Sequence, residues 1–292
     1  MTNFLAGPFV GSRHARDRRV TGRRRLIGWS LSTLTWVLTA LMFFPVAWMM
    51  LTGLKTEADA YSDPPQFLFQ PTLDSYREVL GRGYLPFLLN SIIASLGAAV
   101  LVLALGAATA YALAIRPVRR AKDVTFFYLS TRMLPVAAGI VPLYLLVRSL
   151  GLLDNINIIA ILYAAMNLPI AVWMLRSFFA EVPKEILEAA RVDGAGFLKE
   201  VWHVLIPLTA PGLASTALIC FIFSWNEFFL AVNLTSTTAA TVPVYLSGFI
   251  TGRGLFWAKL SAAATLACLP VVIAGWVAQK KLVQGLSLGA VK

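Results

Sequence analysis

The sequence predicts an all-α, polytopic membrane protein with six transmembrane helices. Three observations predict this class: a shortage of charged residues, six long apolar stretches, and an uneven distribution of Lys and Arg along the chain. Of the 292 residues, 58% are hydrophobic and only 13% are charged, whereas soluble domains carry about 25% charged residues. This composition excludes a disordered chain and an ordinary soluble enzyme.

The six spans are predicted from the lengths of the apolar stretches, because a helix that crosses a bilayer needs about 20 mostly apolar residues. The qualifying segments are Ile27–Leu51, Leu88–Ile115, Val124–Val147, Ile156–Leu175, Thr209–Val232 and Leu260–Ala278. Two long loops, 55–87 and 233–259, follow the first and fifth spans. Within the first loop, Thr72 is suited to cap a short helix.

The distribution of Lys and Arg predicts the orientation of these spans. An even number of spans places both termini on the same side of the membrane. If that side is the cytoplasm, the inside segments hold 18 of the 25 Lys and Arg residues and the outside segments hold 6, with Arg132 inside the third span. The asymmetry satisfies the positive-inside rule, so the net charge of +11 indicates topology rather than nucleic-acid binding. We therefore expect a basic cytoplasmic arm at 1–26, a transmembrane domain at 27–282 and a cytoplasmic tail at 283–292.

The residue types that catalysis needs do not come together in the sequence. Cys220 and Cys268 lie in apolar stretches without metal-ligand spacing, and neither His14 nor His203 has a catalytic partner nearby in the sequence. No Gly-x-x-x-x-Gly-Lys-Ser/Thr phosphate loop occurs. The sequence therefore predicts no catalytic residue, no metal site and no cofactor in this chain, and it disfavours a membrane enzyme.

The loop at 184–207, between the fourth and fifth spans, is the most informative segment. Pro183 suits the first turn of a helix, Lys184–Val192 contains mostly good helix formers, and Gly194 suits a helix stop. We expect a short helix on the cytoplasmic surface. A simple connector is the alternative that composition alone leaves open.

This loop resembles a family motif. Glu188-Ala189-Ala190, then Gly194 after three residues, then Val204-Leu-Ile-Pro207 after nine more, resembles the EAA loop of ABC importer permease subunits, with Val and Ile in place of the family's Ile and Leu. The resemblance to the maltose-permease-like, carbohydrate-uptake branch extends to Pro45–Trp48, Asn90-Ser91, Trp225–Phe228 and the tail that begins at Gln279.

The resemblance implies one permease subunit of an ATP-driven, binding-protein-dependent importer that moves a sugar, oligosaccharide or polyol by alternating access. The loop helix would be a coupling helix that docks on an ATP-binding subunit, and the C-terminal tail would contact the same subunit through Gly285 and Gly289. The docking residues would be Glu188, Ala189, Ala190, Asp193, Gly194 and Pro207. The implied partners are a second related permease subunit, two ATP-binding subunits that hold ATP and Mg, and an extracytoplasmic substrate-binding protein, all at a bacterial cytoplasmic (inner) membrane.

Polar and aromatic residues within the spans are candidates for a substrate pathway, because intramembrane polar groups are costly and usually face a cavity or a neighbouring helix. The candidates are Asn90, Tyr163, Asn167, Trp225, Asn226 and Glu227. Helix packing is the alternative role for these residues. Arg132 lies too far in depth from Glu227 for a direct ion pair, and we expect its side chain to extend toward the cytoplasm.

A stand-alone secondary carrier, which would transport without an ATPase, is the second hypothesis for the function. Many such carriers contain inverted repeats, whereas this sequence shows no convincing internal repeat. The carrier is therefore disfavoured.

Overall fold

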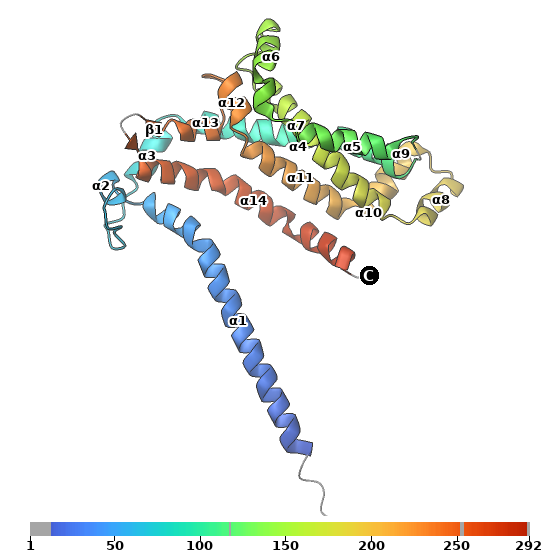
Figure 1. Cartoon of the computed structure of the whole chain (residues 1–292), viewed down its shortest axis with the longest axis horizontal. Coiled ribbons are helices and arrows are strands. Elements are labelled where there is room, and N and C mark those ends of the chain that lie inside the picture. The colour runs from blue at the N-terminus through green and yellow to red at the C-terminus, as the bar shows by residue number, and fades with distance from the viewer. Residues whose placement is uncertain (1–12, 117, 252–253, 291–292) are drawn as a thin grey trace, which may run out of the picture. The chain divides into compact units, whose positions relative to one another are not determined.

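The computed structural model of the protein describes the backbone of residues 13–116, 118–251 and 254–290, and the side chains of 28–116, 118–250 and 255–279. The chain divides into two units, 1–51 and 52–292. Helix α1 (Arg13–Thr52) makes up the described part of the first unit, and its segment Gly28–Thr52 is long and apolar enough to cross a membrane (Figure 1). Large apolar side chains such as Trp36 and Met42 are exposed along it, as is typical of a helix whose surroundings are apolar.

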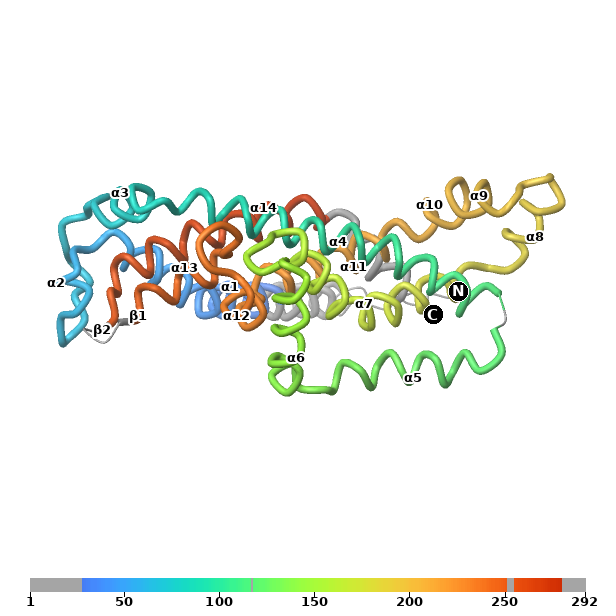
Figure 2. The backbone as a smooth tube through the Cα atoms, turned by 90° about the horizontal axis from the view of Figure 1, so that it is seen from above, coloured from blue at the N-terminus to red at the C-terminus, as the bar shows by residue number. Residues whose placement is uncertain are grey.

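Four long helices form the centre of the second unit: α4 (Tyr84–Ala114), α7 (Ile156–Ala180), α11 (Ala210–Trp225) and α14 (Trp257–Ala290). Helix α4 packs along α7 and α11, and α14 packs on α11 (Figures 1 and 2). Small residues allow this close approach, since a Cβ placed on Gly97 of α4 would lie 3.3 Å from the Cβ of Ala160 in α7. By length and composition, the described residues include four helices able to cross a membrane, and up to six if each of two bent pairs is one span. A helical protein with several membrane spans is therefore confirmed.

The first bent pair replaces the single apolar span that was predicted at Val124–Val147. Helix α5 (Ala121–Arg132) ends at Met133, and α6 (Val136–Ser149) leaves at an angle of 86°. The break has a local cause, because Pro135 supplies no N–H to continue α5 and disfavours helical geometry in Leu134.

The second bent pair joins the predicted loop to the predicted fifth span. Helix α9 (Phe197–Lys199), the π-helix η1 (Glu200–Leu205) and α10 (Ile206–Leu208) form one segment, which meets α11 at 78°. Helix α11 ends at Trp225, and the remainder of the predicted span forms the separate helix α12 (Phe229–Leu234).

Short elements fill the two long loops. The first loop holds α2 (Glu57–Ala60) and α3 (Asp74–Gly81), and the second holds α13 (Val242–Ser247) and a small antiparallel pair, β1 (Ile250–Thr251) with β2 (Gly254–Leu255). The helix predicted after Thr72 is confirmed as α3, although Leu73 rather than Thr72 occupies the N-cap position. The hydroxyl oxygen of Thr72, one residue earlier, accepts a hydrogen bond of 3.2 Å from the N–H of Asp74.

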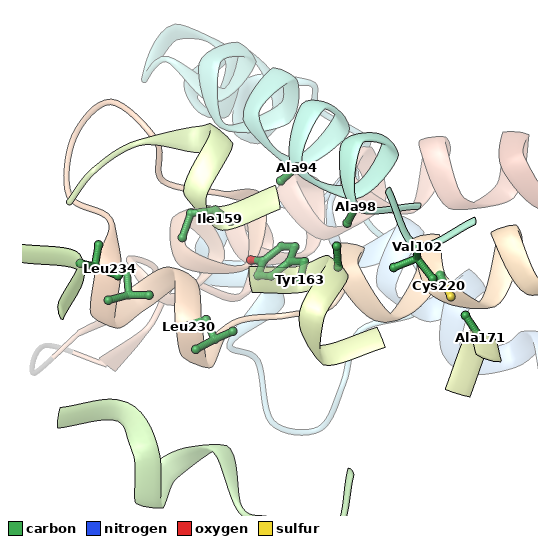
Figure 3. Close-up of a cluster of buried hydrophobic side chains, with 11 residues drawn as sticks. Ala94, Ala98, Val102, Ile159, Tyr163, Ala171, Cys220, Leu230 and Leu234 are labelled. Atoms are coloured by element: carbon green, nitrogen blue, oxygen red, sulfur yellow. The ribbon is translucent and has the colours of Figure 1, made fainter. Parts of the chain in front are cut away.

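The largest buried cluster joins α4, α7, α11 and α12 (Figure 3). Tyr163 of α7 lies at its centre, 1% exposed, among Ala94 and Ala98 of α4 and Leu230 of α12. Small side chains on α4 leave room for this tyrosine, so its ring fixes the spacing of the helices.

Candidate functional site

The loop between α7 and α11 forms the expected short helix, α8 (Lys184–Val192), which begins after Pro183. Its end follows a Schellman pattern: the N–H of Ala195 donates to the carbonyl of Ala190 over 2.9 Å, and the N–H of Gly194 donates to that of Arg191 over 3.0 Å. Gly194 adopts φ +82°, which a residue with a side chain rarely accepts. The predicted helix and its stop at Gly194 are confirmed.

Helix α8 buries one side and exposes the other. Leu187 is 2% exposed, and it borders a hollow between α8 and the ends of α4 and α7 that Phe179 and Val182 also line. Glu188 and Ala189 are exposed and Ala190 is half-buried. Asp193 and Gly194 are exposed just beyond the helix, and Pro207 is exposed in α10. The residues predicted for docking therefore lie on an accessible surface.

An ion pair that the sequence analysis missed fixes α8 to the next segment. Arg191, in the last turn of α8, contacts Glu200 of η1 through two hydrogen bonds, Nε to Oε2 at 2.7 Å and Nη2 to Oε1 at 2.8 Å. The hydroxyl of Tyr111 in α4 donates to the same Oε1 over 2.9 Å. The Glu200 side chain is only 2% exposed, so these donors compensate a buried carboxylate. Hydrogen bonding to Glu200 raises the pKa of Arg191 above its ordinary value, although partial burial lowers it.

A polar cluster joins the end of α5, the middle of α7 and the end of α11. Asn167 of α7 is fully buried, and its amide donates to the hydroxyl of Ser224 in α11 over 3.0 Å. Nη1 of Arg132 donates to the side-chain oxygen of Asn167 over 3.3 Å and to the carbonyl of Met166 over 2.7 Å. The guanidinium carbon also lies 5.1 Å from the centre of the Phe223 ring, a cation–π distance.

This cluster changes the interpretation of Arg132. It does not pair with Glu227, but the reason is not the expected difference in depth, since Arg132 contacts Phe223, only four residues before Glu227. The Glu227 carboxylate instead accepts the N–H groups of Leu230 and Ala231 at the start of α12. The expectation that Arg132 extends toward the cytoplasm is wrong, because its guanidinium is held at the middle of α7. Within the described part of the chain, no carboxylate forms an ion pair with it.

Three other pathway candidates lie in different surroundings. The hydroxyl of Tyr163 donates to the carbonyl of Glu227 over 3.1 Å. Trp225 is 4% exposed and stacks on Phe221 at 5.7 Å between ring centres. Asn226 is exposed at the end of α11, where its amide donates to the carbonyl of Ile222 over 2.8 Å. The structure therefore brings Tyr163 and Glu227 together, and Arg132 with Asn167, but it gathers no single site from all six candidates.

The remaining candidate, Asn90, belongs to a clamp on the loop at 235–241. Its amide donates to the carbonyls of Thr238 at 2.7 Å and Ala240 at 3.0 Å. From the turn before α7, the Asp154 carboxylate accepts the backbone N–H groups of residues 236–239. Burial raises the pKa of Asp154, but hydrogen bonds led by that from Thr238 lower it more, so the net pKa lies below its ordinary value.

The tail residues Gly285 and Gly289 fall outside the described side chains, although the backbone of α14 continues through both.

The ion pair between Arg191 and Glu200, which the sequence analysis missed, had a signal in the sequence. Glu200 is an acidic residue at the edge of an apolar run, nine residues after Arg191, and buried carboxylates need a partner.

Comparisons with known proteins show the family to which this chain belongs. Residues 106–287 match the family described as binding-protein-dependent transport system inner membrane component. The probable ABC transporter permease protein y4oR of Sinorhizobium fredii is 38% identical over 264 residues, which covers 90% of this chain and 95% of that protein. The trehalose transport system permease protein SugB of Mycobacterium tuberculosis is 33% identical over 276 residues, which covers 93% and 99%.

A solved structure has the same fold. One chain of a bacterial ABC transporter involved in the import of the acidic polysaccharide alginate superimposes with a TM-score of 0.70 at 25% identity, covering 94% of this chain and all of that chain. The family match includes both α8 and the cluster around Asn167. The chain therefore belongs to the family of inner membrane components of binding-protein-dependent transport systems.

Proposed function

We propose that this chain is one permease subunit of an ABC importer that moves a carbohydrate into the cell by alternating access. Its family makes it a multi-pass inner membrane transport protein rather than a catalytic enzyme. The observation that carries the proposal is the extended similarity to permeases named for sugar uptake, which include the trehalose protein SugB and the diacetylchitobiose uptake protein DasC of Streptomyces coelicolor, 32% identical over 254 residues.

The proposed topology has six spans with both termini in the cytoplasm. Each bent pair counts as one span, which gives six together with α1, α4, α7 and α14. In this arrangement α8 lies on the cytoplasmic side and acts as the coupling helix, with Glu188, Ala189 and Asp193 facing the ATP-binding subunit. The positive-inside distribution of Lys and Arg supports this orientation.

The proposed substrate pathway passes Arg132, at the end of α5, where its guanidinium contacts α7 and α11. This guanidinium, the Phe223 ring beneath it and the exposed Asn226 offer the donors and the apolar face that sugars bind. Asn167 and Ser224 hold Arg132 in place, and Tyr163, Trp225 and Glu227 support the neighbouring helices. In this proposal Asn90 secures the loop at 235–241 on the extracytoplasmic side of the membrane.

The proposed partners are a second permease, two ATP-binding subunits that use ATP and Mg, and an extracytoplasmic binding protein. The clamped loop at 235–241 and the loop at 55–87 would form the surface that meets this binding protein. The tail at Gly285 and Gly289 would contact an ATP-binding subunit.

The experiment that tests this function is a mild-detergent pull-down of the tagged chain from its own membranes, followed by mass spectrometry. We expect an ATP-binding protein, a second permease and a binding protein, and the binding protein is then titrated with labelled trehalose, maltose and diacetylchitobiose. Glu188→Lys should lose the ATP-binding protein, while Arg148→Met, at an exposed position in the last turn of α6, should retain it. A chain that purifies alone and moves solute without ATP would refute the importer and favour a secondary carrier.

A further inference from the structure

We infer that Arg191, Glu200 and Tyr111 form a rigid joint that transmits movement of α8 to the membrane helices. This inference rests on the proposed function, in which the ATP-binding subunits move α8. The three residues are positioning residues, since they act through the elements that they connect.

The covalent connection alone would transmit movement poorly. The turn between α8 and α9 contains Gly194 and Gly196, and a Cβ placed on either would meet nothing within 4 Å. The hydrogen bonds of Gly194 and Ala195 hold the first part of this turn to α8 and not to α9, and glycine has no side chain to restrain the backbone between the two helices. A pull on α8 would therefore be absorbed by the turn unless a second connection bridged it.

The ion pair supplies that second connection. Arg191 and Glu200 lie on opposite sides of the turn, and their two hydrogen bonds of 2.7 and 2.8 Å fix both the distance and the relative orientation of the side chains. A bidentate guanidinium–carboxylate contact has this geometric specificity, which a lysine would lack. Because the Glu200 side chain is 2% exposed, water cannot readily replace its partner.

Tyr111 and the surrounding apolar contacts extend the joint into the helices. The Tyr111 hydroxyl binds Glu200 from α4, and its ring contacts Phe197 of α9 edge to face at 5.2 Å between ring centres. Leu205 of η1 is buried in the same cluster as Leu175 and Phe179 of α7. Movement of Glu200 with α8 would therefore displace both α4 and α7.

The test measures how far the pathway responds to each ATP hydrolysed. The complete importer is reconstituted in nanodiscs, with Cys220→Ala and Cys268→Ser to remove native thiols and Phe223→Cys as the reporter beside Arg132. The readouts are the rate of maleimide labelling with and without ATP, and the rate of ATP hydrolysis. Co-purification of the ATP-binding subunits is measured in parallel.

Arg191→Met should lower the ATP-dependent change in labelling, per ATP hydrolysed, by at least about tenfold, because it leaves Glu200 buried without its partner. Arg191→Lys should give an intermediate value, since it keeps the charge but not the paired hydrogen bonds. Tyr111→Phe should also weaken the response. The ATP-binding subunits should still co-purify, because the residues proposed to face them, Glu188, Ala189 and Asp193, are unchanged. Arg148→Met is the matched control and should have no effect, because this exposed arginine in the last turn of α6 forms no ion pair with the described residues.

If the Arg191→Met subunit does not assemble into the importer, Arg191→Lys and Tyr111→Phe test the joint in its place. A full response in both Arg191→Lys and Tyr111→Phe, with ATP hydrolysis intact, would overturn the joint and leave the proposed function standing. If the importer with unaltered Arg191 shows no labelling change with ATP, the proposed function itself fails, and the joint fails with it.

Discussion

Replacing Gly194 tests whether the end of α8 requires a left-handed residue. Its φ is +82°, and a Cβ there would meet nothing within 4 Å, so backbone strain is the only folded-state cost of alanine. That strain is about 1–2 kcal/mol, and the less flexible unfolded chain of alanine offsets about 0.4–1 kcal/mol of it. The net destabilisation is therefore roughly 1 kcal/mol. Asparagine tolerates this region better than alanine, and valine tolerates it worse.

The assay is a titration of the purified ATP-binding subunit against the permease in nanodiscs. If docking requires the ordered turn, 1 kcal/mol weakens the affinity by about fivefold, and the affinities should decrease in the order Gly, Asn, Ala, Val. Gly196 offers a matched control two residues away, because its φ is −71° and a Cβ there also meets nothing within 4 Å. Equal losses for alanine at both positions, or a larger loss for asparagine than for alanine at Gly194, would refute the reasoning.

Three further predictions concern packing, pH and cargo. Gly212→Ala should destabilise the chain by about 1–3 kcal/mol in thermal unfolding, because its Cβ would overlap the Phe178 ring. Gly139→Ala is the control and should not destabilise the chain, since a Cβ there meets nothing within 4 Å. Equal melting temperatures for the two variants would contradict the predicted overlap at Gly212. The pKa of Asp154 is lowered in the folded chain, so its ionised form stabilises the loop at 235–241 at every pH above the ordinary pKa of an aspartate. This stabilisation is lost progressively as the pH falls below about 4. Cleavage of the loop by pepsin, divided at each acidic pH by its cleavage of an unfolded reference peptide, should therefore increase as pH falls in the unaltered chain but stay high and constant in Asp154→Asn, and identical normalised profiles would be inconsistent with the clamp. Arg132→Gln should reduce uptake of the identified sugar while leaving complex assembly unchanged, and unaltered uptake would remove Arg132 from the pathway.

Local chemistry made α8 predictable from the sequence, whereas its anchoring depends on residues that only the fold brings together. Pro183 and Gly194 act on their own turn of the chain, so a helix at Lys184–Val192 follows from residue type and spacing. Tyr111 meets Glu200 across 89 positions in the sequence, and no periodicity predicts such a contact.

The breaks in the third and fifth predicted spans have a different reason. Apolar length predicts that a segment enters a membrane, but it does not predict that the helix is continuous. Pro135 stops α5, and near Asn226 and Glu227 the α11 helix ends because the Glu227 carboxylate binds the first N–H groups of α12 instead. The polar residues that suggested a pathway in the sequence partly serve to end helices in the structure.

Arg191 and Arg132 both contact buried partners but differ in what neutralises their charge, and this difference distinguishes the proposed joint from the proposed substrate pathway. Arg191 meets a buried carboxylate, so its charge is cancelled where it stands and little remains to attract a ligand. Arg132 contacts only neutral groups among the described residues, namely the oxygens of Met166 and Asn167 and the Phe223 ring, and only its Nη1 makes a hydrogen bond to them. An uncancelled charge at the middle of a span is costly unless water or a ligand reaches it. Arg132 also lies at the bend between α5 and α6. Non-helical backbone at membrane depth is tolerated where it is covered by protein or lines a water-filled cavity, so the bend also supports a pathway in which water or a ligand reaches Arg132.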